Sequence, residues 1–587
     1  MIFGKHINRY YLKYGAVLLL GVIALLVVDY AQLLIPEIYG AIIDGLDPKT
    51  TAVLTSDSLV KLCLQMLVVV AIMVAGRFLW RVCFFGSAIN VEADLRGKMF
   101  DKCKDFSQQY YKVNKVGNMM SLFTNDLETI NECFGDGMLM LFDAVLLGGM
   151  AFYKMFTLNL YLTLFALVPA VFMVAIGAIM CKYLMAKWAE RQEAYSEISD
   201  YTQESFSGIA VIKAFVKEML ELMAFKRLNK KNEKVNVAFT RASVLLNIMV
   251  SMFMGTVITL VIGYGGWLAY TGAFSVASLI KFISYFSTLT WPVMAVANLI
   301  EMASRGRASL NRISELLDTQ IDVKDKEGAV DAEFIGGKIE FRNLSFRYPD
   351  GDRDVLQNLS FVIEQGENVG IIGKTGCGKS TLVDLILRTY NVEDGTLFVD
   401  DMDVNSITIR SLRRFAAYVP QDNFLFSDTI KNNIAFSLGE EESNQSEIEE
   451  AAMLADIHEN ITGFKEGYET MLGERGVTIS GGQKQRTSIA RALMKNASIL
   501  VLDDALSAVD TKTEENILEG LKKNRKGKTT ILIAHRISSV ENMDKILYME
   551  DGKVLAIGNH QELVEGCEEY RKLVELQELE KEEGGNN

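Results

Sequence analysis

A glycine-rich loop carrying one lysine is the clearest chemical feature of this 587-residue sequence. The loop follows the apolar run 368–372 and precedes a helix-like segment from Leu382 to Arg388. Its spacing, GxxxxGK[ST] between a strand and a helix, predicts a site for a nucleoside triphosphate, because converging N–H groups and a lysine bind phosphates and a hydroxyl binds Mg²⁺. The loop residues are Gly373, Lys374, Thr375, Gly376, Cys377, Gly378, Lys379, Ser380 and Thr381.

Two carboxylates follow a second apolar run, 498–502. A carboxylate at the end of a buried strand next to a phosphate loop holds Mg²⁺, usually through water, and we assign this role to Asp503. Asp504 would then lie beside the attacking water. His535 also ends an apolar run, where a lone histidine is as often structural as functional.

The residues around these motifs alternate between short apolar runs and longer helical segments, after a polar linker near Asp322 to Gly337. This pattern predicts an α/β domain. Residues 1–336 hold 31 Lys and Arg against 30 Asp and Glu, and residues 337–587 hold 29 against 44, so the net charge of −14 arises in the second half. An acidic domain lacks the basic face that nucleic acids require, so we expect no nucleic-acid partner.

The first half predicts a membrane domain, because six stretches are apolar enough and long enough to cross a bilayer. They lie at about 15–40, 58–82, 133–155, 160–184, 243–271 and 276–300. Lys and Arg concentrate in the N-terminal segment and in the second-to-third and fourth-to-fifth connections, so both termini are expected in the cytosol. The seven cysteines show no CxxC pair and no metal-ligand spacing, which agrees with reduced thiols and a cytosolic second half.

Proline is absent between Leu59 and Gln109 and between Pro169 and Pro292. A continuous helix over the first interval would be roughly 75 Å long, more than twice the thickness of the hydrocarbon core, so long cytosolic helical extensions are expected. Four ionisable residues fall within the expected spans, where such side chains line a water-filled pathway or pair between helices. They are Asp29, Arg77, Asp143 and Lys281.

These motifs, together with Ser480-Gly481-Gly482-Gln483, resemble those of the ATP-binding cassette (ABC) transporters, and six spans followed by one cassette resemble the half-transporters of ABC exporters. The resemblance covers nearly the whole chain. It implies a multidomain protein with an all-α six-helix transmembrane domain of the type I/IV exporter fold at 1–320 and a linker at 321–336. An α/β P-loop ATP-binding domain at 337–575 and a charged tail at 576–587 would follow, with ATP and Mg²⁺ as ligands.

The resemblance also implies roles for single residues. Tyr348 corresponds to the aromatic residue that stacks on adenine, and Gly373 to Thr381 correspond to the Walker A loop. Gln421 corresponds to the Q-loop glutamine, which touches Mg²⁺ and the transmembrane domain. Asp503 corresponds to the Walker B aspartate, Ser507 to Asp510 to the D-loop, and His535 to the switch histidine. Ser480 to Gln483 correspond to the signature motif, which contacts the ATP held by a partner cassette, since two cassettes close head to tail.

Two positions depart from the family pattern. Ile479 precedes the signature where Leu is usual, and Asp504 stands where a Glu polarises the hydrolytic water. Asp is shorter by one C–C bond, about 1.5 Å, and misplacing a catalytic group by about 1 Å can lower a rate on the order of a hundredfold. We therefore hypothesise that this chain's own site binds ATP but hydrolyses it poorly, and that a different half-transporter carrying Glu completes the assembly, as in bacterial heterodimeric multidrug-type exporters. The alternative is a homodimer in which Asp504 serves as the base.

The function implied is ATP-driven export of hydrophobic or amphipathic compounds across a bacterial cell membrane. Segments Gly117 to Asp126 and Ser207 to Phe215 resemble the coupling helices that dock on cassettes. Two other functions remain open: a lipid or peptide exporter, and a cassette protein that regulates without transporting.

Overall fold

The computed structural model describes residues 3–46, 55–438, 444–473, 476 and 478–584, with the backbone alone at 169–179, 181–182, 297 and 580–584. Contacts divide the chain into two units, Met1–Asp101 with Gly117–Asp318 and Lys102–Val116 with Thr319–Asn587. We call them the membrane unit and the cassette unit. A short piece of the first half, Lys102–Val116, therefore belongs with the cassette.

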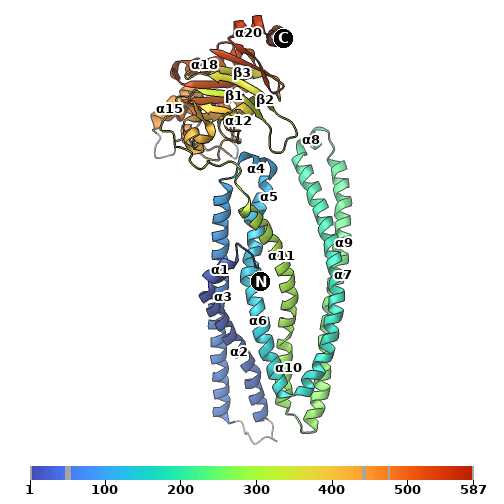
Figure 1. The fold of residues 1–587 in the computed structure, drawn as a ribbon. Coiled ribbons are helices and arrows are strands. Elements are labelled where there is room, and N and C mark those ends of the chain that lie inside the picture. The colour runs from blue at the N-terminus through green and yellow to red at the C-terminus, as the bar shows by residue number, and fades with distance from the viewer. Residues whose placement is uncertain (1–2, 47–54, 439–443, 474–475, 477, 585–587) are drawn as a thin grey trace. The chain divides into compact units, whose positions relative to one another are not determined.

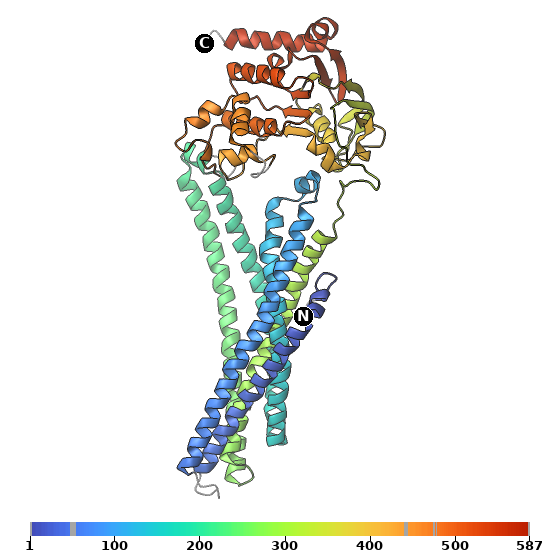
Figure 2. The same ribbon diagram turned by 90° about the vertical axis from the view of Figure 1, so that its left-hand side faces the viewer.

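The membrane unit is built from long helices that run side by side (Figures 1 and 2). Neighbouring pairs include α7 with α9, α6 with α11 and α2 with α10. In chain order, and including α4, which belongs to the cassette unit, the helices of the first half are Asn8–Lys13 (α1), Gly15–Leu46 (α2), Ser56–Cys103 (α3), Gln108–Val113 (α4), Val116–Ser121 (α5), the π-helical turn Leu122–Asp126 (η1), Leu127–Leu158 (α6), Leu160–Ser207 (α7), Ile209–Ala214 (α8), Glu218–Tyr270 (α9), Val276–Thr288 (α10) and Thr290–Asp318 (α11).

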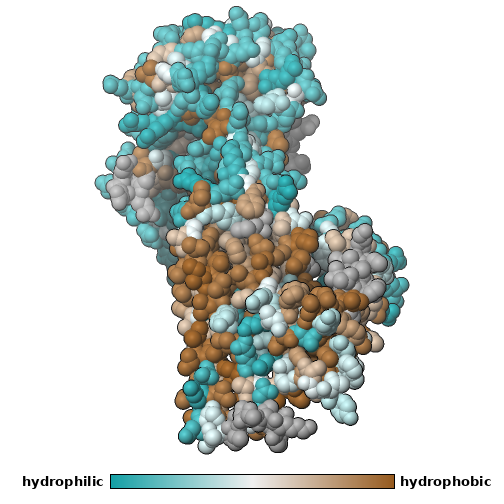
Figure 3. All heavy atoms as spheres, turned by 60° about the horizontal axis from the view of Figure 1, so that its bottom comes forward, coloured by the Kyte–Doolittle hydropathy of each residue, from teal (hydrophilic) through white to brown (hydrophobic). Residues whose placement is uncertain are grey.

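Five helical stretches among the described residues are long and apolar enough to cross a membrane. They contain the first, second, third and sixth expected spans and all but the last residue of the fifth. The fourth expected span lies in α7, partly on residues whose side chains fall outside the description. Figure 3 shows hydrophobic side chains over much of the surface of the membrane unit, as contact with lipid requires.

The long helices and short outward turns follow the sequence prediction. Helix α3 has 48 residues, which gives a length of roughly 72 Å. Asn159 alone separates α6 from α7, and its side chain caps α7 by accepting a hydrogen bond from the N–H of Leu162 at 2.9 Å. Ser275 caps α10 in the same way after a five-residue turn. The mass of the unit outside the expected spans therefore lies in the helical extensions and not in the outward loops.

Two of the charged residues within the spans lie at contacts between helices. Asp29 is 1% exposed, and Asp143 accepts a hydrogen bond from the indole N–H of Trp291 at 2.5 Å. Arg77, in contrast, is exposed and Lys281 is half-buried in this chain. These positions favour an interhelical role for the two aspartates.

The cassette unit contains two sheets, ordered β2-β1-β4-β5 and β10-β9-β3-β8-β7-β6. The strands are Ile339–Phe346 (β1), Leu356–Ile363 (β2), Asn368–Gly373 (β3), Leu397–Val399 (β4), Met402–Asp403 (β5), Ala416–Val419 (β6), Ile499–Asp503 (β7), Thr529–Ile533 (β8), Lys545–Glu550 (β9) and Lys553–Gly558 (β10). The helices are Lys379–Ile386 (α12), Ile409–Arg414 (α13), Ile430–Ala435 (α14), Gln445–Leu454 (α15), His458–Thr462 (α16), Gly481–Met494 (α17), Thr511–Asn524 (α18), Ile537–Val540 (α19), His560–Gly566 (α20) and Glu568–Gly584 (α21), with short 3₁₀ turns at Val404–Ser406 (η2) and Gly467–Glu469 (η3).

Parallel pairing aligns the ends of three central strands. Strand β3 pairs with β8, and β8 pairs with β7, in registers that place Ile371 and Asp503 beside Ile533. The strands are nearly all apolar and buried, as is usual for parallel strands covered on both faces. Their carboxyl ends meet at one edge of the sheet, so the residues that follow them lie together.

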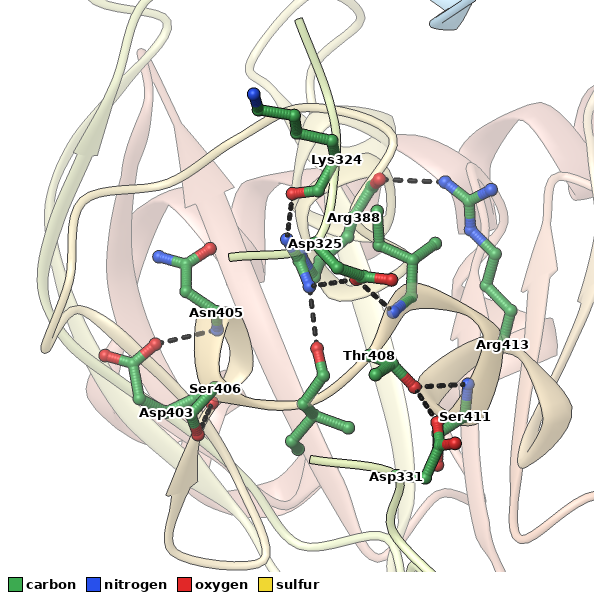
Figure 4. A network of polar contacts seen from close by, with 12 residues as sticks. Lys324, Asp325, Asp331, Arg388, Asp403, Asn405, Ser406, Thr408, Ser411 and Arg413 are labelled. Atoms are coloured by element: carbon green, nitrogen blue, oxygen red, sulfur yellow. Dashed lines mark hydrogen bonds and ion pairs between the residues drawn. The ribbon is translucent and has the colours of Figure 1, made fainter. Parts of the chain in front are cut away.

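The linker is held on the cassette by a buried arginine (Figure 4). Arg388 is 1% exposed and donates hydrogen bonds to the carbonyl oxygens of Ile407 at 2.7 Å and Lys324 at 3.2 Å. The carboxylate of Asp325 lies 3.5 Å from the same guanidinium and also accepts the N–H of Ile409 at 2.7 Å. Because a buried charge must be paired, these contacts fix the linker against the cassette surface.

Candidate functional site

The phosphate loop lies between β3 and α12, as its spacing predicts. Gly378 has φ +98°, and a Cβ built there would lie 2.6 Å from Cδ2 of Leu356, so only glycine fits this position without strain. The Nζ atom of Lys379 donates hydrogen bonds to the carbonyl oxygens of Gly373 at 2.8 Å and Lys374 at 3.0 Å. The lysine side chain thus folds back along the loop that it follows.

One cavity of about 310 Å³ brings most of the predicted site residues together. Five separate segments contribute to it: the ends of β3, β7 and β8, the segment after β6 and the segment between β1 and β2. Its lining residues are Tyr348, Val355, Thr375, Gly376, Gly378, Lys379, Ser380, Thr381, Gln421, Asp503, Asp504, Ile533 and His535. Of the predicted loop residues, Gly373, Lys374 and Cys377 do not line it, and neither does the segment Ser480 to Gln483.

The two aspartates at the end of β7 lie in different environments. Asp503 is buried, and burial raises the pKa of its carboxyl, as does the charge of Asp504, while the Ser380 hydroxyl and Lys379 act in the opposite direction. Asp504 has φ +50°, and its N–H donates to the carbonyl oxygen of Ile533 at 3.0 Å. Its Oδ2 accepts a hydrogen bond from Nε2 of Gln421 at 3.3 Å.

The side chains in the cavity fit a nucleotide with Mg²⁺. A serine hydroxyl, an aspartate and a glutamine amide supply the oxygen ligands that Mg²⁺ prefers, and Lys379 supplies positive charge beside them. No cluster of three His, Cys, Asp or Glu side chains suited to a metal occurs in the described part of the chain. Mg²⁺ usually keeps several water ligands and is bound through one or two carboxylates together with substrate phosphates. When bound, Mg²⁺ would neutralise phosphate charge.

His535 is held by a residue that sequence reasoning missed. Its carbonyl oxygen accepts a hydrogen bond from Nε2 of Gln577 at 2.8 Å, and Oε1 of Gln577 accepts the N–H of Ile537 at the same distance. Gln577 lies in α21, within a charged C-terminal segment. Nothing in its sequence context marks it, because the contact forms only when α21 packs beside the end of β8.

The signature segment begins helix α17 outside the cavity. Oγ of Ser480 accepts the N–H of Gln483 and Oε1 of Gln483 accepts the N–H of Ser480, which forms a capping box. A Cβ at Gly482 would lie 2.8 Å from the carbonyl oxygen of Ala508, so the helix start and the predicted D-loop are in close contact. Gln485, also missed from sequence, accepts the N–H of Ala508 at 3.0 Å and donates to Oγ of Ser507 at 3.2 Å.

Helix α4 is a cytosolic segment of the first half that belongs to the cassette unit. Contacts assign Lys102–Val116 to the cassette unit and Gly117 onward to the membrane unit. In the predicted segment Gly117 to Asp126 the side chains of Met119 and Asp126 are buried, and docking of this segment on a cassette stays a prediction. Helix α8 falls inside the second predicted segment, Ser207 to Phe215, and belongs to the membrane unit.

A helical membrane unit followed by an α/β unit with a phosphate loop, a strand-end aspartate and the segment Ser480 to Gln483 at the start of α17 defines a half-transporter driven by a nucleotide. Residues 18–293 match the family described as ABC transporter transmembrane region, and residues 356–507 match the family described as ABC transporter. The chain is 35% identical over 584 residues to the probable multidrug resistance ABC transporter ATP-binding/permease protein YheI of Bacillus subtilis (strain 168), which covers 99% of this chain and 98% of that protein. It is also 35% identical over 504 residues to an ATP-dependent lipid A-core flippase of Syntrophus aciditrophicus (strain SB), across 83% of this chain and 80% of that protein.

This chain belongs to the ABC transporter family and is an exporter half-transporter. A solved structure of a bacterial Atm1-family ABC exporter with ATP bound has the same fold, with a TM-score of 0.76 and 24% identity over 97% of this chain and 98% of that one. The protein is therefore a multi-pass membrane protein with a cytosolic domain that binds ATP and depends on Mg²⁺, and it acts with a second cassette. The expectations for family, fold class, ligands and membrane location are confirmed.

Proposed function

We propose that this chain is one half of an ATP-driven exporter of hydrophobic or amphipathic compounds, and that its partner is a different half-transporter. The multidrug description of the Bacillus subtilis relative supports the substrate class. The apolar character of the long helices is compatible with substrates that partition into lipid.

Within the cavity we assign the following roles to the lining residues. Tyr348 stacks on adenine, and the loop from Gly373 to Thr381 binds the phosphates through its N–H groups and Lys379. Ser380, Gln421 and Asp503 hold Mg²⁺, with Asp503 acting through water. His535 and Gln421 orient groups around the γ-phosphate.

The position of Asp504 supports weak hydrolysis at this chain's own site. The hydrogen bond from its N–H to Ile533 holds the backbone at the end of the sheet, so the carboxylate can advance only by the length of its side chain. That side chain has one methylene fewer than Glu, and its Oδ2 already accepts a hydrogen bond from Gln421. A general base must come within about 3 Å of the proton it takes, and we infer that Asp504 stops short of the water that a Glu would reach.

The signature segment supports a role in a second, competent site. Ser480 to Gln483 retain the helix-capping arrangement at the N-terminus of α17, a 14-residue helix whose positive dipole end suits phosphate. This segment lies outside the chain's own cavity. We propose that it completes the site of a partner that carries Glu after its Walker B aspartate.

Two alternatives compete with this proposal. A homodimer that exports lipid is favoured by the similarity to the lipid A-core flippase, and it requires Asp504 to act as the base; a peptide exporter is the other variant of this reading. A cassette protein that regulates without transporting is compatible with a weak site.

The test is to compare ATP hydrolysis by the chain purified alone with that of the chain co-expressed with the product of its neighbouring gene. The proposal expects low activity alone and high activity together. Full activity of the chain alone, abolished by Asp504→Asn, contradicts the heterodimer. Uptake of a fluorescent amphipath and of a labelled lipid into inverted vesicles then separates the substrate classes, and ATP-driven uptake of neither supports the regulatory alternative.

A further inference from the structure

Helix α4 touches the tyrosine to which we assign adenine stacking. The ammonium of Lys112 lies over the ring of Tyr348, 5.2 Å from its centroid, and over the ring of Tyr390, 5.3 Å from that centroid. Its Nζ also donates a hydrogen bond to the hydroxyl of Tyr390 at 2.9 Å. A cation in these positions is attracted by the electron-rich faces of both rings.

The two tyrosines form one aromatic group. Their centroids are 5.0 Å apart with an angle of 81° between the rings, and Phe346 packs edge-on against both. Tyr390 is 3% exposed, whereas Tyr348 lines the cavity that holds the phosphate loop. Tyr348 is also tied to that loop, because its hydroxyl is hydrogen-bonded to Oγ1 of Thr381 at 2.8 Å.

Lys112 reaches Tyr348 from outside the cavity. It is not among the residues that line the cavity, and it comes from a helix that precedes the cassette by more than two hundred residues in the sequence. Lys112 therefore contacts the ring of Tyr348 without itself lining the cavity.

Further contacts fix the helix that carries Lys112. Oγ of Ser107 donates to the carboxylate of Asp322 in the linker at 2.7 Å, and Asn391, next to Tyr390, donates to the carbonyl oxygen of Asp322 at 2.7 Å. Gln109, which is 7% exposed, accepts a hydrogen bond from the Tyr390 hydroxyl at 3.3 Å. Helix α4, the linker and the two tyrosines therefore form one connected group.

The surroundings keep Lys112 in its charged form. Burial alone would lower the pKa of Lys112, but the Tyr390 hydroxyl, Tyr348 and Asp384 outweigh it and raise the pKa above its ordinary value. The cation over the rings is therefore present throughout the physiological pH range.

We propose that Lys112 is a positioning residue for the adenine base: it holds the Tyr348 ring in the orientation that stacks on adenine, and it thereby links occupancy of the base position to helix α4 of the same chain. This inference rests on the proposed assignment of Tyr348. It extends that assignment by making affinity for the base, and not for the phosphates, depend on a residue of the first cytosolic loop.

Two ligands test this inference: a non-hydrolysable ATP analogue and tripolyphosphate, each with Mg²⁺, titrated calorimetrically into the full chain in lipid discs. Only the first carries a base. Lys112→Met should weaken binding of the ATP analogue about two- to fivefold, the range of a cation–π contact at an exposed site, and leave the tripolyphosphate affinity unchanged. Lys112→Arg should restore binding of the analogue, because a guanidinium stacks on aromatic rings at least as well.

Lys115→Met is the matched control, since it removes the same charge three residues further on, and it should change neither affinity. Equal weakening of both ligands by Lys112→Met, or no weakening of either, overturns the inference. Tyr348→Ala separates it from the proposed function: if that variant binds the ATP analogue normally, the assignment of Tyr348 itself is wrong. If Tyr348→Ala weakens the analogue and Lys112→Met does not, the assignment stands and the role of Lys112 fails.

Discussion

Lengthening the side chain at position 504 should activate this chain's own ATP site. In Asp504→Glu the carboxylate advances by one C–C bond, about 1.5 Å. The backbone there has φ +50°, a conformation that Asp tolerates better than Glu. The substitution therefore costs at most about 1–2 kcal/mol of folding free energy, and the cassette should stay folded.

The expected gain in rate exceeds this cost. Correcting a displacement of about 1 Å raises a rate on the order of a hundredfold, equivalent to about 2.7 kcal/mol of transition-state stabilisation. Turnover of an assembly of two copies of this chain should then rise about a hundredfold, whereas an assembly that already contains one competent partner site should gain about twofold. The size of the increase thus reports which assembly is present.

The assay is steady-state phosphate release by the purified transporter in lipid discs, with saturating Mg²⁺ and ATP. Asp504→Asn is the control, because it keeps the length of Asp and removes its basicity. If Asp504→Glu leaves turnover unchanged or lowers it while Asp504→Asn abolishes it, Asp504 is a fully working base and the reasoning from side-chain length is refuted.

Three further predictions concern the cassette. Gly378→Ala should destabilise the cassette and weaken ATP binding by more than the roughly 1–2 kcal/mol that a left-handed residue costs, because the new Cβ would lie 2.6 Å from a leucine methyl. Gly376→Ala is the control: its Cβ has open space around it, so it should lose only the roughly 1–2 kcal/mol of the left-handed backbone conformation. Equal effects of the two substitutions in calorimetry contradict this prediction. Gln577→Ala should lower the free energy of unfolding by about 1–3 kcal/mol, the contribution of two hydrogen bonds, and should reduce ATP hydrolysis. Gln577→Glu keeps the oxygen that accepts the N–H of Ile537, so it should show roughly half of that destabilisation. An unchanged melting temperature and turnover in Gln577→Ala contradict this prediction. Burial raises the pKa of the Asp503 carboxyl above its usual 3.8, so its contribution to stability is present below pH 3.8 and is lost as the pH rises through the folded pKa. In thermal unfolding without nucleotide, the stability of Asp503→Asn relative to the wild type should therefore increase from acid to neutral pH. A stability difference that does not change with pH contradicts the raised pKa.

Local sequence features determined the membrane helices and the phosphate loop. Apolar runs and the absence of proline determine helices as long as α3, since backbone hydrogen bonds in lipid must be satisfied within the segment. The loop from Gly373 to Thr381 is equally local, because a strand, its turn and the next helix are adjacent in the chain. Strand ends at Asp503 and near His535 could also be identified, since apolar runs ended there.

Contacts between distant segments were decided only by the tertiary structure. Gln577 contacts the backbone of His535, 42 residues away in the sequence, and Lys112 contacts Tyr390, 278 residues away. No sequence pattern around these residues predicts either contact. The grouping of Lys102–Val116 with the cassette unit is likewise a result of packing that no pattern in the sequence indicated. The sequence by itself therefore determined which chemistry this protein carries, because that chemistry sits in short contiguous motifs. Only the tertiary structure decided which side chains hold those motifs in place, because packing brings together residues that are far apart in the sequence and that no local pattern links.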